Sequence, residues 1–343
     1  MHRPNIGAVH SIRVAAVICL SVTAAMAQSA TSRIVSAANT FLSTLEQKQR
    51  DSVLFAFDDE AQRARWSNLP TTIVRRAGLS MGSLSDAQRS AAMALVSTAL
   101  SRRGFEKVQQ IMDGDELLKT NEKSSKMFGK SLFYVAILGK PSEKDPWMLQ
   151  FGGHHLALNI TIAAERGILT PSLTGAQPAL YNVNGKTVRP LGEENDKAYA
   201  LLNALDESQK KQAILNYRVA DLVLGPGQDG KTIQPEGLKA SAMNEHQRAM
   251  LLDLISEWAG IVHESAAAAR MSEIKAAIED TWFAWSGSTT VTPGRNGTAY
   301  YRIQGPKLVI EYAPQPLGGD PTLHIHTIYR DPTNDYGRKV AAK

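Results

Sequence analysis

The sequence predicts an α+β fold with a mostly antiparallel sheet. Two blocks of strand-like segments predict the sheet, one between residues 132 and 162 and one from Trp282 to Arg330. Helical patterns precede and separate these blocks, so helices and strands do not alternate regularly as they do in parallel β-α-β folds. We therefore expect a sheet built from two strand blocks and packed with several helices.

The first 27 residues have the pattern of a secretory signal peptide. Arg3 and Arg13 precede an apolar run, 14–22, and an Ala-x-Ala cleavage site ends at Ala27. The run is too short to cross a membrane, and the isoleucine before Cys19 does not fit a lipid-attachment signal. We expect cleavage after Ala27 and a secreted or periplasmic protein. Cys19 is the only cysteine, so thiolate metal sites and cysteine nucleophiles are excluded from the mature chain.

Residues 28–343 are predicted to form a single domain. Removal of Arg3 and Arg13 leaves 36 basic residues against 33 acidic ones, a net charge of about +3. That balance does not indicate binding to nucleic acid or to a membrane surface. No other segment is apolar enough to span a membrane. The pattern shows no internal repeat, no low-complexity linker and no clear domain boundary.

The N-terminal part is predicted to be mainly helical. Apolar residues at helical spacing predict a helix over 33–50, and a short apolar run predicts a strand over 52–57. Ser85 followed by Gln88 is a capping box and predicts the start of the next helix. The buried face of that helix is expected to contain Ala92, Leu95, Val96 and Ala99. It should end near Gly104, and a further helix is predicted over 105–122.

The middle of the chain is predicted to contain the first strand block. Strands are expected over 132–138, 147–151 and 155–162, the last two joined at Gly152-Gly153. The segment 164–195 is rich in Gly, Pro and Asn and is predicted to be a long ordered loop. Helices are then expected over 195–220 and 244–280.

The C-terminal block contains a predicted hairpin and a histidine-rich strand. Residues 300–304 and 308–312 are apolar and aromatic, and Gly305-Pro306 lies between them, as in a β-hairpin. The following strand, 324–330, contains His324 and His326. Side chains alternate along a strand, so both imidazoles and the Arg330 side chain should project from one face.

Four of the six histidines of the mature chain lie in two short stretches, which predicts a metal site. A His-x-His pair on a strand presents two rings to one ion, although a buried pair bonded to carbonyl groups is an alternative. If a strand begins at His155, this residue shares a face with Asn159, whereas His154 points to the apolar face. His155 is therefore the stronger ligand candidate, and His154 is either a fourth ligand or a core histidine.

Several polar residues on these strands are candidates for further roles. Glu311 lies in an otherwise apolar strand, so it is either exposed or a site residue, in which case it is a candidate general base. Arg302 and Gln304 share a face of the preceding strand and either border the same cavity or face solvent.

Polar residues near the histidines are also candidates. Arg330 is a candidate to bind an anionic group of a substrate. Asp335 and Asn159 are candidates to orient the ligating imidazoles. Asp331 is expected to form an Asx turn.

Four long motifs resemble a secreted family of unknown function, DUF3500. The motifs are residues 147–159 (WMLQFGGHHLALN), 170–178 (TPSLTGAQP), 301–311 (YRIQGPKLVIE) and 324–337 (HIHTIYRDPTNDYG). The resemblance extends over essentially the whole mature chain. The family supplies no settled activity, cofactor or substrate, so the chemistry has to be inferred from the residues.

These residues favour a secreted metal-dependent enzyme. Imidazole and carboxylate ligands suit Zn²⁺ above all, and also Cu²⁺ or Fe²⁺. With Zn²⁺, three ligands and an open position would support hydrolysis, with Glu311 as base. With Cu²⁺ or Fe²⁺, the same ligands would support redox chemistry. The alternatives are a non-catalytic periplasmic or extracellular protein that binds a metal or a small ligand, and a purely structural polar core. The sequence does not identify a substrate.

Overall fold

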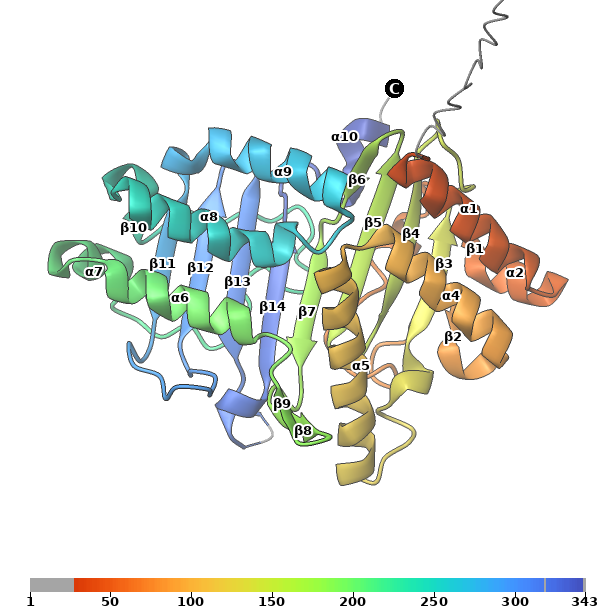
Figure 1. Cartoon of the computed structure of the whole chain (residues 1–343), viewed down its shortest axis with the longest axis horizontal. Coiled ribbons are helices and arrows are strands. Elements are labelled where there is room, and N and C mark those ends of the chain that lie inside the picture. The colour runs from red at the N-terminus through yellow and green to blue at the C-terminus, as the bar shows by residue number, and fades with distance from the viewer. Residues whose placement is uncertain (1–27, 318, 342–343) are drawn as a thin grey trace, which may run out of the picture.

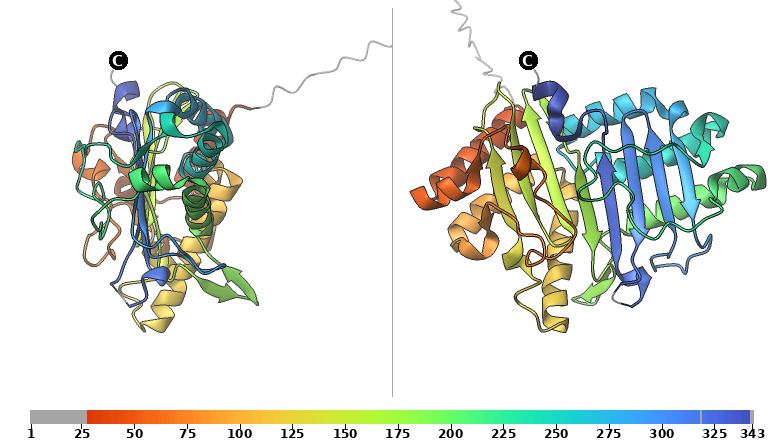
Figure 2. Two further views of the ribbon diagram at one scale, coloured as in Figure 1. Left: turned by 90° about the vertical axis from the view of Figure 1, so that its left-hand side faces the viewer. Right: turned by 180° about the vertical axis from the view of Figure 1, so that it is seen from behind.

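A large twisted sheet forms the centre of the molecule, with helices packed on one of its faces (Figures 1 and 2). The computed structural model describes residues 28–317 and 319–341, so the predicted signal peptide, 1–27, lies outside the described residues. The sheet contains 12 strands, and among the described strands only β1 and β3 pair in parallel. The predicted α+β fold with a mostly antiparallel sheet is confirmed. None of the described helices is long and apolar enough to cross a membrane.

The elements follow one another in two series, separated by a small hairpin. The first series is α1 (Ala30–Ser43), α2 (Gln47–Val53), β1 (Leu54–Phe55), α3 (Glu60–Arg63), β2 (Leu79–Ser80), α4 (Asp86–Ala99), α5 (Arg102–Asn121), β3 (Tyr134–Leu138), β4 (Trp147–Gly153), β5 (Leu156–Ala163), β6 (Arg166–Ile168) and β7 (Ser172–Ala176). The hairpin consists of β8 (Tyr181–Val183) and β9 (Lys186–Val188). The second series is α6 (Gly192–Ala204), α7 (Glu207–Ala213), β10 (Leu238–Lys239), α8 (Glu245–Ala259), α9 (Glu264–Ala276), β11 (Trp282–Ser286), β12 (Tyr300–Gly305), β13 (Leu308–Pro314), β14 (Ile325–Arg330) and α10 (Arg338–Ala341).

The two series are copies of one arrangement. Each has two helices, a long segment, a two-residue strand, two more helices and then a run of antiparallel strands. The strand order is β3-β4-β5-β7 in the first half and β11-β12-β13-β14 in the second, and the halves meet at β7 and β14. Figure 1 shows the two halves side by side, with the join in the middle of the sheet. The prediction that the chain has no internal repeat is therefore wrong.

Equivalent hydrogen bonds reveal the sequence repeat. Gln88 caps α4, donates to the carbonyl of Thr44 and bonds Gln49. Gln247 caps α8 and makes the same bonds to Ala204 and Gln209.

The short strands before these helices also correspond. Gly78 and Gly237 precede β2 and β10 with φ of 96° and 94°, and a Cβ at either position would overlap a carbonyl oxygen of the neighbouring strand. The repeat is thus preserved where the backbone or a helix cap demands a particular residue, and also at buried residues of the capped helices, such as Leu95 and Leu254.

The strands β7 and β14 join the halves. They pair antiparallel over five residues, with Thr174 opposite Thr327. The two threonine hydroxyls are 2.7 Å apart, and the Trp258 indole donates to Thr327 at 2.9 Å. Because β5 also pairs antiparallel with β7, β5 and β14 run in the same direction on either side of it.

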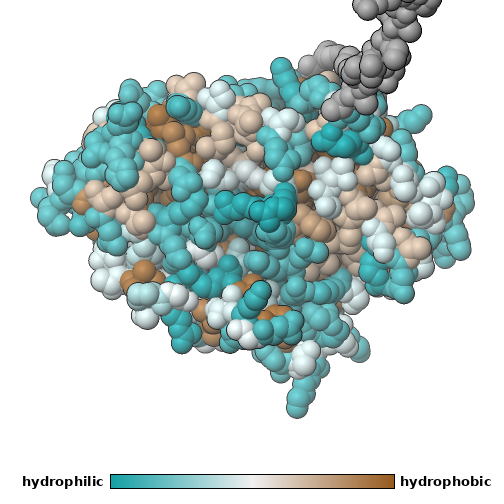
Figure 3. Space-filling view, in the orientation of Figure 1, coloured by the Kyte–Doolittle hydropathy of each residue, from teal (hydrophilic) through white to brown (hydrophobic). Residues whose placement is uncertain are grey.

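The two faces of the sheet are covered differently. The helices α1, α4, α5, α6, α8 and α9 pack on one face, and two long segments, 56–78 and 214–237, cross the other (Figure 2). We refer to these as the first and second covering segments. The outward side of the helical layer is mostly hydrophilic (Figure 3). Along β14, Ile325 and Tyr329 enter the main core, whereas Ile328 packs with Trp66 of the first covering segment.

Several predicted boundaries are corrected by capping residues. The predicted helix 33–50 is two helices, because Glu46 begins α2 with its own capping box. The predicted strand 52–57 has only two paired residues, β1. The predicted helix 244–280 breaks at Gly260 and divides into α8 and α9. The predicted helix 195–220 is also two helices, α6 and α7, because Asp206 begins α7 with its own capping box, and α7 ends at Ala213, where the second covering segment begins.

The largest error concerns the predicted loop 164–195. It contains β7, which lies in the middle of the sheet between β5 and β14. Its sequence, Ser-Leu-Thr-Gly-Ala, has no alternation and low strand propensity. All five residues are buried, so neighbouring strands and packing on both faces determine the conformation instead. The predicted hairpin of β12 and β13 and the helix capped by Ser85 are confirmed, and the four expected residues of α4 are buried.

The duplicated caps are expected to contribute equally to stability. Gln88→Ala and Gln247→Ala should each lower the free energy of unfolding by about 1–2 kcal/mol, because each removes a cap and a bond to a neighbouring helix. Urea denaturation measures both values, with the exposed Gln212→Ala as the unaffected control. A loss at one site and none at the other would contradict the equivalence of the halves.

Candidate metal centre

Strand direction brings two distant histidine pairs together. His155 immediately precedes β5, and His324 immediately precedes β14. These strands run the same way on either side of β7, so their first residues lie at the same edge of the sheet. His326 projects from β14 opposite Gly175 of β7. The convergence therefore follows directly from the pairing of the two halves.

His155 adopts an unusual backbone conformation that differs from the prediction. It was expected to begin a strand, but it is a turn residue with φ of 59°, and β5 begins at Leu156. The left-handed conformation costs about 1–2 kcal/mol for a residue with a side chain. Two backbone bonds hold it: its carbonyl accepts from Gly175 at 2.7 Å, and its N–H donates to the Asn68 carbonyl at 3.4 Å.

Gly175 provides the space that His155 occupies. A Cβ at this position would lie 2.8 Å from the Ile325 carbonyl oxygen and 3.3 Å from the Cβ and Cδ2 of His155. A residue with a side chain would therefore push the imidazole away from β14.

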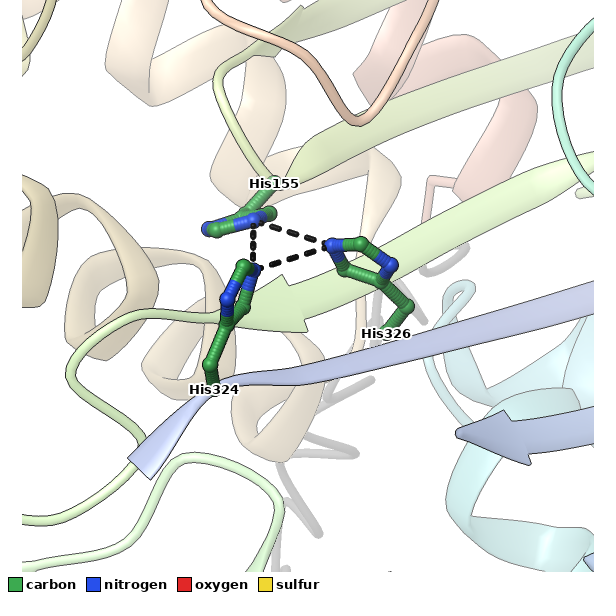
Figure 4. A group of neighbouring side chains, drawn as sticks. All are labelled: His155, His324 and His326. Atoms are coloured by element: carbon green, nitrogen blue, oxygen red, sulfur yellow. Dashed lines mark hydrogen bonds between the residues drawn. The ribbon is translucent and has the colours of Figure 1, made fainter. Parts of the chain in front are cut away.

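Three imidazole nitrogens form a small triangle (Figure 4). The Nε2 of His324 lies 3.0 Å from that of His155 and 3.1 Å from that of His326, and the third side is 3.2 Å. All three rings are buried, with at most 6% of each residue exposed. The surrounding residues reach the surface, because Leu317 is 75% exposed and the Asp221 side chain 51% exposed. The triangle thus lies just beneath the surface.

The Nδ1 contacts of His324 and His326 indicate which tautomer each imidazole adopts. The Nδ1 of His324 is 2.7 Å from the Leu317 carbonyl oxygen, and the Nδ1 of His326 is 3.2 Å from an Asp221 carboxylate oxygen. Both oxygens can only accept, so each Nδ1 carries the proton and, in the neutral ring, each Nε2 a lone pair. A carbonyl or carboxylate behind each imidazole is the usual arrangement around metal-bound histidines.

The electrostatics favour neutral rings at His155 and His324. Burial lowers the pKa of His155 well below its usual value, and the neighbouring imidazoles lower it further. Burial also lowers the pKa of His324 to about 4, despite the hydrogen bond to Leu317. Burial raises the pKa of the Asp221 carboxyl, but hydrogen bonds with His326, the Leu222 N–H and Gln315 together outweigh this and leave the pKa below its usual value.

The triangle has the size of a metal-binding face. With Zn–N distances of about 2.0–2.1 Å, a tetrahedral ion places neighbouring donors about 3.3 Å apart. The three observed separations, 3.0–3.2 Å, are close to this value. In the described part of the chain, the three histidines are the residues grouped closely enough to hold an ion.

The comparison with family models agrees with the resemblance of the motifs. A model described as a protein of unknown function (DUF3500) matches residues 27–338. The chain belongs to the DUF3500 family. The searches of curated proteins and of solved structures found no match. Two of the four motifs that carry the resemblance contain the three histidines, and a third, 170–178, contains Gly175.

His154, predicted as a possible fourth ligand, does not join the triangle in this DUF3500 protein. Its Nδ1 bonds a buried carboxylate oxygen of Asp115 at 2.6 Å. The other oxygen of Asp115 accepts from the Gly129 N–H. The His154 ring lies between His155, at a centroid distance of 3.7 Å, and Phe128, at 5.0 Å. The His154 ring therefore packs against the His155 ring and helps to fix its position.

Glu311, the candidate general base, makes other contacts. One carboxylate oxygen accepts from the Val223 N–H at 2.9 Å and the Tyr300 hydroxyl at 2.6 Å. The other accepts from the Leu224 N–H at 2.8 Å. Burial raises the pKa of Glu311, and these donors oppose the rise. Both oxygens are thus engaged by protein groups and do not face the triangle.

Arg330 and Asp335 also hold the backbone in place. Arg330 is 1% exposed and donates to the carbonyls of Leu224 and Gly225. It also pairs with Asp229 and Asp335, each at 2.9 Å. The expected roles, binding an anionic substrate for Arg330 and orienting an imidazole for Asp335, have no support in these contacts.

The remaining candidates bind the covering segments or the sheet. Arg302 pairs with Glu236, and Gln304 donates to the Ile233 carbonyl. Asn159 accepts from Gln150 and donates to the Pro171 carbonyl. These side chains project from the same face of the sheet as His326, but their polar groups bind the covering segments and neighbouring strands.

Two residues near the triangle were not found from the sequence. Asp221 bonds His326, and the Asn68 side-chain nitrogen lies 3.4 Å from both nitrogens of the same ring. Each lies in a covering segment, more than 100 residues away along the chain, and nothing in the local pattern marks it.

Gly175→Ala is expected to impair metal binding. The added methyl group displaces His155, so the affinity for Zn²⁺ should fall at least about tenfold, and stability by about 1–3 kcal/mol. Competition with a chromophoric chelator measures the affinity. Gly185→Ala, in the β8–β9 turn with φ of 74° and no atom near the new methyl group, is the control for general strain. Unchanged Zn²⁺ affinity in Gly175→Ala would contradict the proposed geometry.

Proposed function

We propose that this protein is a metal-dependent hydrolase whose Zn²⁺-type centre consists of His155, His324 and His326. One observation carries the proposal: the Nε2 atoms of His324 and His326 are 3.1 Å apart although both Nδ1 protons point away. Two lone pairs at that distance repel each other, and a cation between them removes the repulsion. The strained backbone of His155 supports the same conclusion, since strain concentrates at functional sites.

The number of ligands supports catalysis. Three imidazoles leave a fourth position of a tetrahedral ion for water, as in catalytic rather than structural zinc sites. Bound Zn²⁺ lowers the pKa of such a water and makes hydroxide available near neutral pH. The chain would hold the ion through the three rings and fix the rings through Leu317 and Asp221. The same nitrogen donors also accept Cu²⁺ or Fe²⁺.

A non-catalytic metal-binding role is the second candidate. The observation that favours it is the depth of the site, because no more than 6% of any of the three residues is exposed. A substrate has to reach an open position beside Asp221 and Leu317 in a hydrolase, whereas a metal-storage or structural site needs no such access.

Metal analysis of the purified protein tests metal binding, which both candidate functions require. After incubation with Zn²⁺ and removal of excess metal, we expect about one ion per chain in the wild type and in His154→Ala. His155→Ala and His326→Ala should lose most of it. A wild type without bound metal, after incubation with Zn²⁺ or with Cu²⁺, would remove the proposal.

Hydrolysis of an activated ester, 4-nitrophenyl acetate, separates the two candidates. A hydrolase should turn over this probe faster than the same concentration of free Zn²⁺, and His326→Ala or a chelator should abolish the difference. Bound metal with no turnover above that of free Zn²⁺ would favour the non-catalytic role.

We also propose that the protein is exported. The proposal is supported by the charged, apolar and Ala-x-Ala pattern of residues 1–27. Intact-mass measurement of the protein recovered outside the cytoplasm should give a chain beginning at Gln28. A full-length chain that stays in the cytoplasm would contradict this.

A further inference from the structure

The second covering segment is fastened to the sheet by a series of buried polar side chains. They come from four consecutive strands, β11 to β14, and together contact the segment from Tyr217 to Glu236. The contacts are Ser286 to Tyr217 and Val219, Glu311 to Val223 and Leu224, Arg330 to Leu224, Gly225 and Asp229, Gln304 to Ile233, and Arg302 to Glu236. The segment has no regular structure to satisfy its own backbone, so these side chains do so.

Glu311 lies opposite Ile328, two residues from His326 along β14. It is fully buried, and two of the three groups that bond it are consecutive backbone N–H groups, those of Val223 and Leu224. Burying a carboxylate is unfavourable unless charge-assisted hydrogen bonds replace its hydration. A neutral side chain would fill the same space without this penalty. The charge therefore serves to fix the position of those two peptide groups.

The fixed peptides lie immediately after the residue that contacts the centre. Asp221 precedes Val223 by two residues and accepts from the His326 Nδ1. The Gln315 side chain, at 2.8 Å, and the Leu222 N–H, at 2.6 Å, donate to the same Asp221 oxygen. Because Asp221 is half exposed, these contacts and the anchored backbone are what keep its carboxylate against the imidazole.

We propose that Glu311 is a positioning residue of the metal centre, which it influences through Asp221 rather than by contact with the ion. The inference rests on the proposed metal site. It replaces the expected role of Glu311 as a general base: the carboxylate holds Val223 and Leu224, these place Asp221, and Asp221 orients His326 and strengthens its Nε2 as a donor. Carboxylates behind a ligating imidazole typically improve metal affinity by about 10–100-fold.

A double-mutant cycle tests this inference. Zn²⁺ affinity is measured by chelator competition for the wild type, Glu311→Gln, Asp221→Asn and the double variant. Asp221→Asn should weaken binding by about 10–100-fold. Glu311→Gln should weaken it by about tenfold and should add less than about twofold in the Asp221→Asn background. The visible spectrum of the Co²⁺-loaded protein should change in both single variants.

Gln304→Met is the matched control. It removes another buried anchor of the same segment, the bond to the Ile233 carbonyl, ten residues beyond Val223. We expect a loss of stability and unchanged Zn²⁺ affinity and Co²⁺ spectrum. Glu311→Asp keeps the charge but shortens the side chain, and provides the same test if Glu311→Gln does not fold.

The possible failures are distinguishable. No metal in the wild type would overturn the proposed function and this inference with it. Metal binding that falls in Asp221→Asn but not in Glu311→Gln would overturn the inference alone. Additive losses in the double variant, or an equal loss in Gln304→Met, would show that Glu311 acts only through general stability.

Discussion

The pairing of β7 with β14 determines most of what is distinctive about this molecule. It joins two copies of a helix-and-strand arrangement into one continuous sheet. It also places β5 and β14 on either side of β7. These two strands run in the same direction, so their first residues lie at the same edge of the sheet. His155 and His324 are 169 residues apart in the chain, and this pairing brings them to the same edge of the sheet, where their Nε2 atoms are 3.0 Å apart.

The duplication also explains why one face of the sheet carries buried polar and charged side chains. In both halves the helices bury apolar side chains on the same face, and a long segment crosses the other face. Most of each segment forms neither a helix nor a strand, so polar side chains of the sheet satisfy part of its backbone. Gln150 does this in the first half, and Glu311, Arg302 and Gln304 do it in the second. Buried charge on this face therefore mostly indicates anchoring, and the contacts of the three histidines give no such explanation for the triangle.

Sequence reasoning found the features that depend on local chemistry. Alternation along 324–330 predicted which side chains share a face, and the cap at Ser85 and the Gly305-Pro306 turn gave correct elements. Sequence reasoning failed where contacts between residues that are distant in the chain determine the structure. The strand β7 has a loop-like composition and is ordered by its two neighbours. The repeat became evident only when the capping bonds and glycines of the two halves were compared.

The site was predicted in part for the same reason. A histidine pair is visible in a sequence, whereas the residues behind it, Asp221 and Asn68, come from segments without a pattern. Conversely, Glu311 and Arg330 were predicted to be site residues because charged side chains are unusual in apolar strands. In the structure, both side chains instead form hydrogen bonds with the backbone of the second covering segment.

X-ray absorption spectroscopy of the Zn²⁺-loaded protein tests the central claim most directly, because it reports the ligands of the ion itself. Three imidazole nitrogens at about 2.0–2.1 Å, with one further light atom, are the predicted first shell. His326→Ala should reduce the imidazole contribution to two. A first shell with one imidazole or none in the wild type would contradict the convergence of His155, His324 and His326 on a single ion.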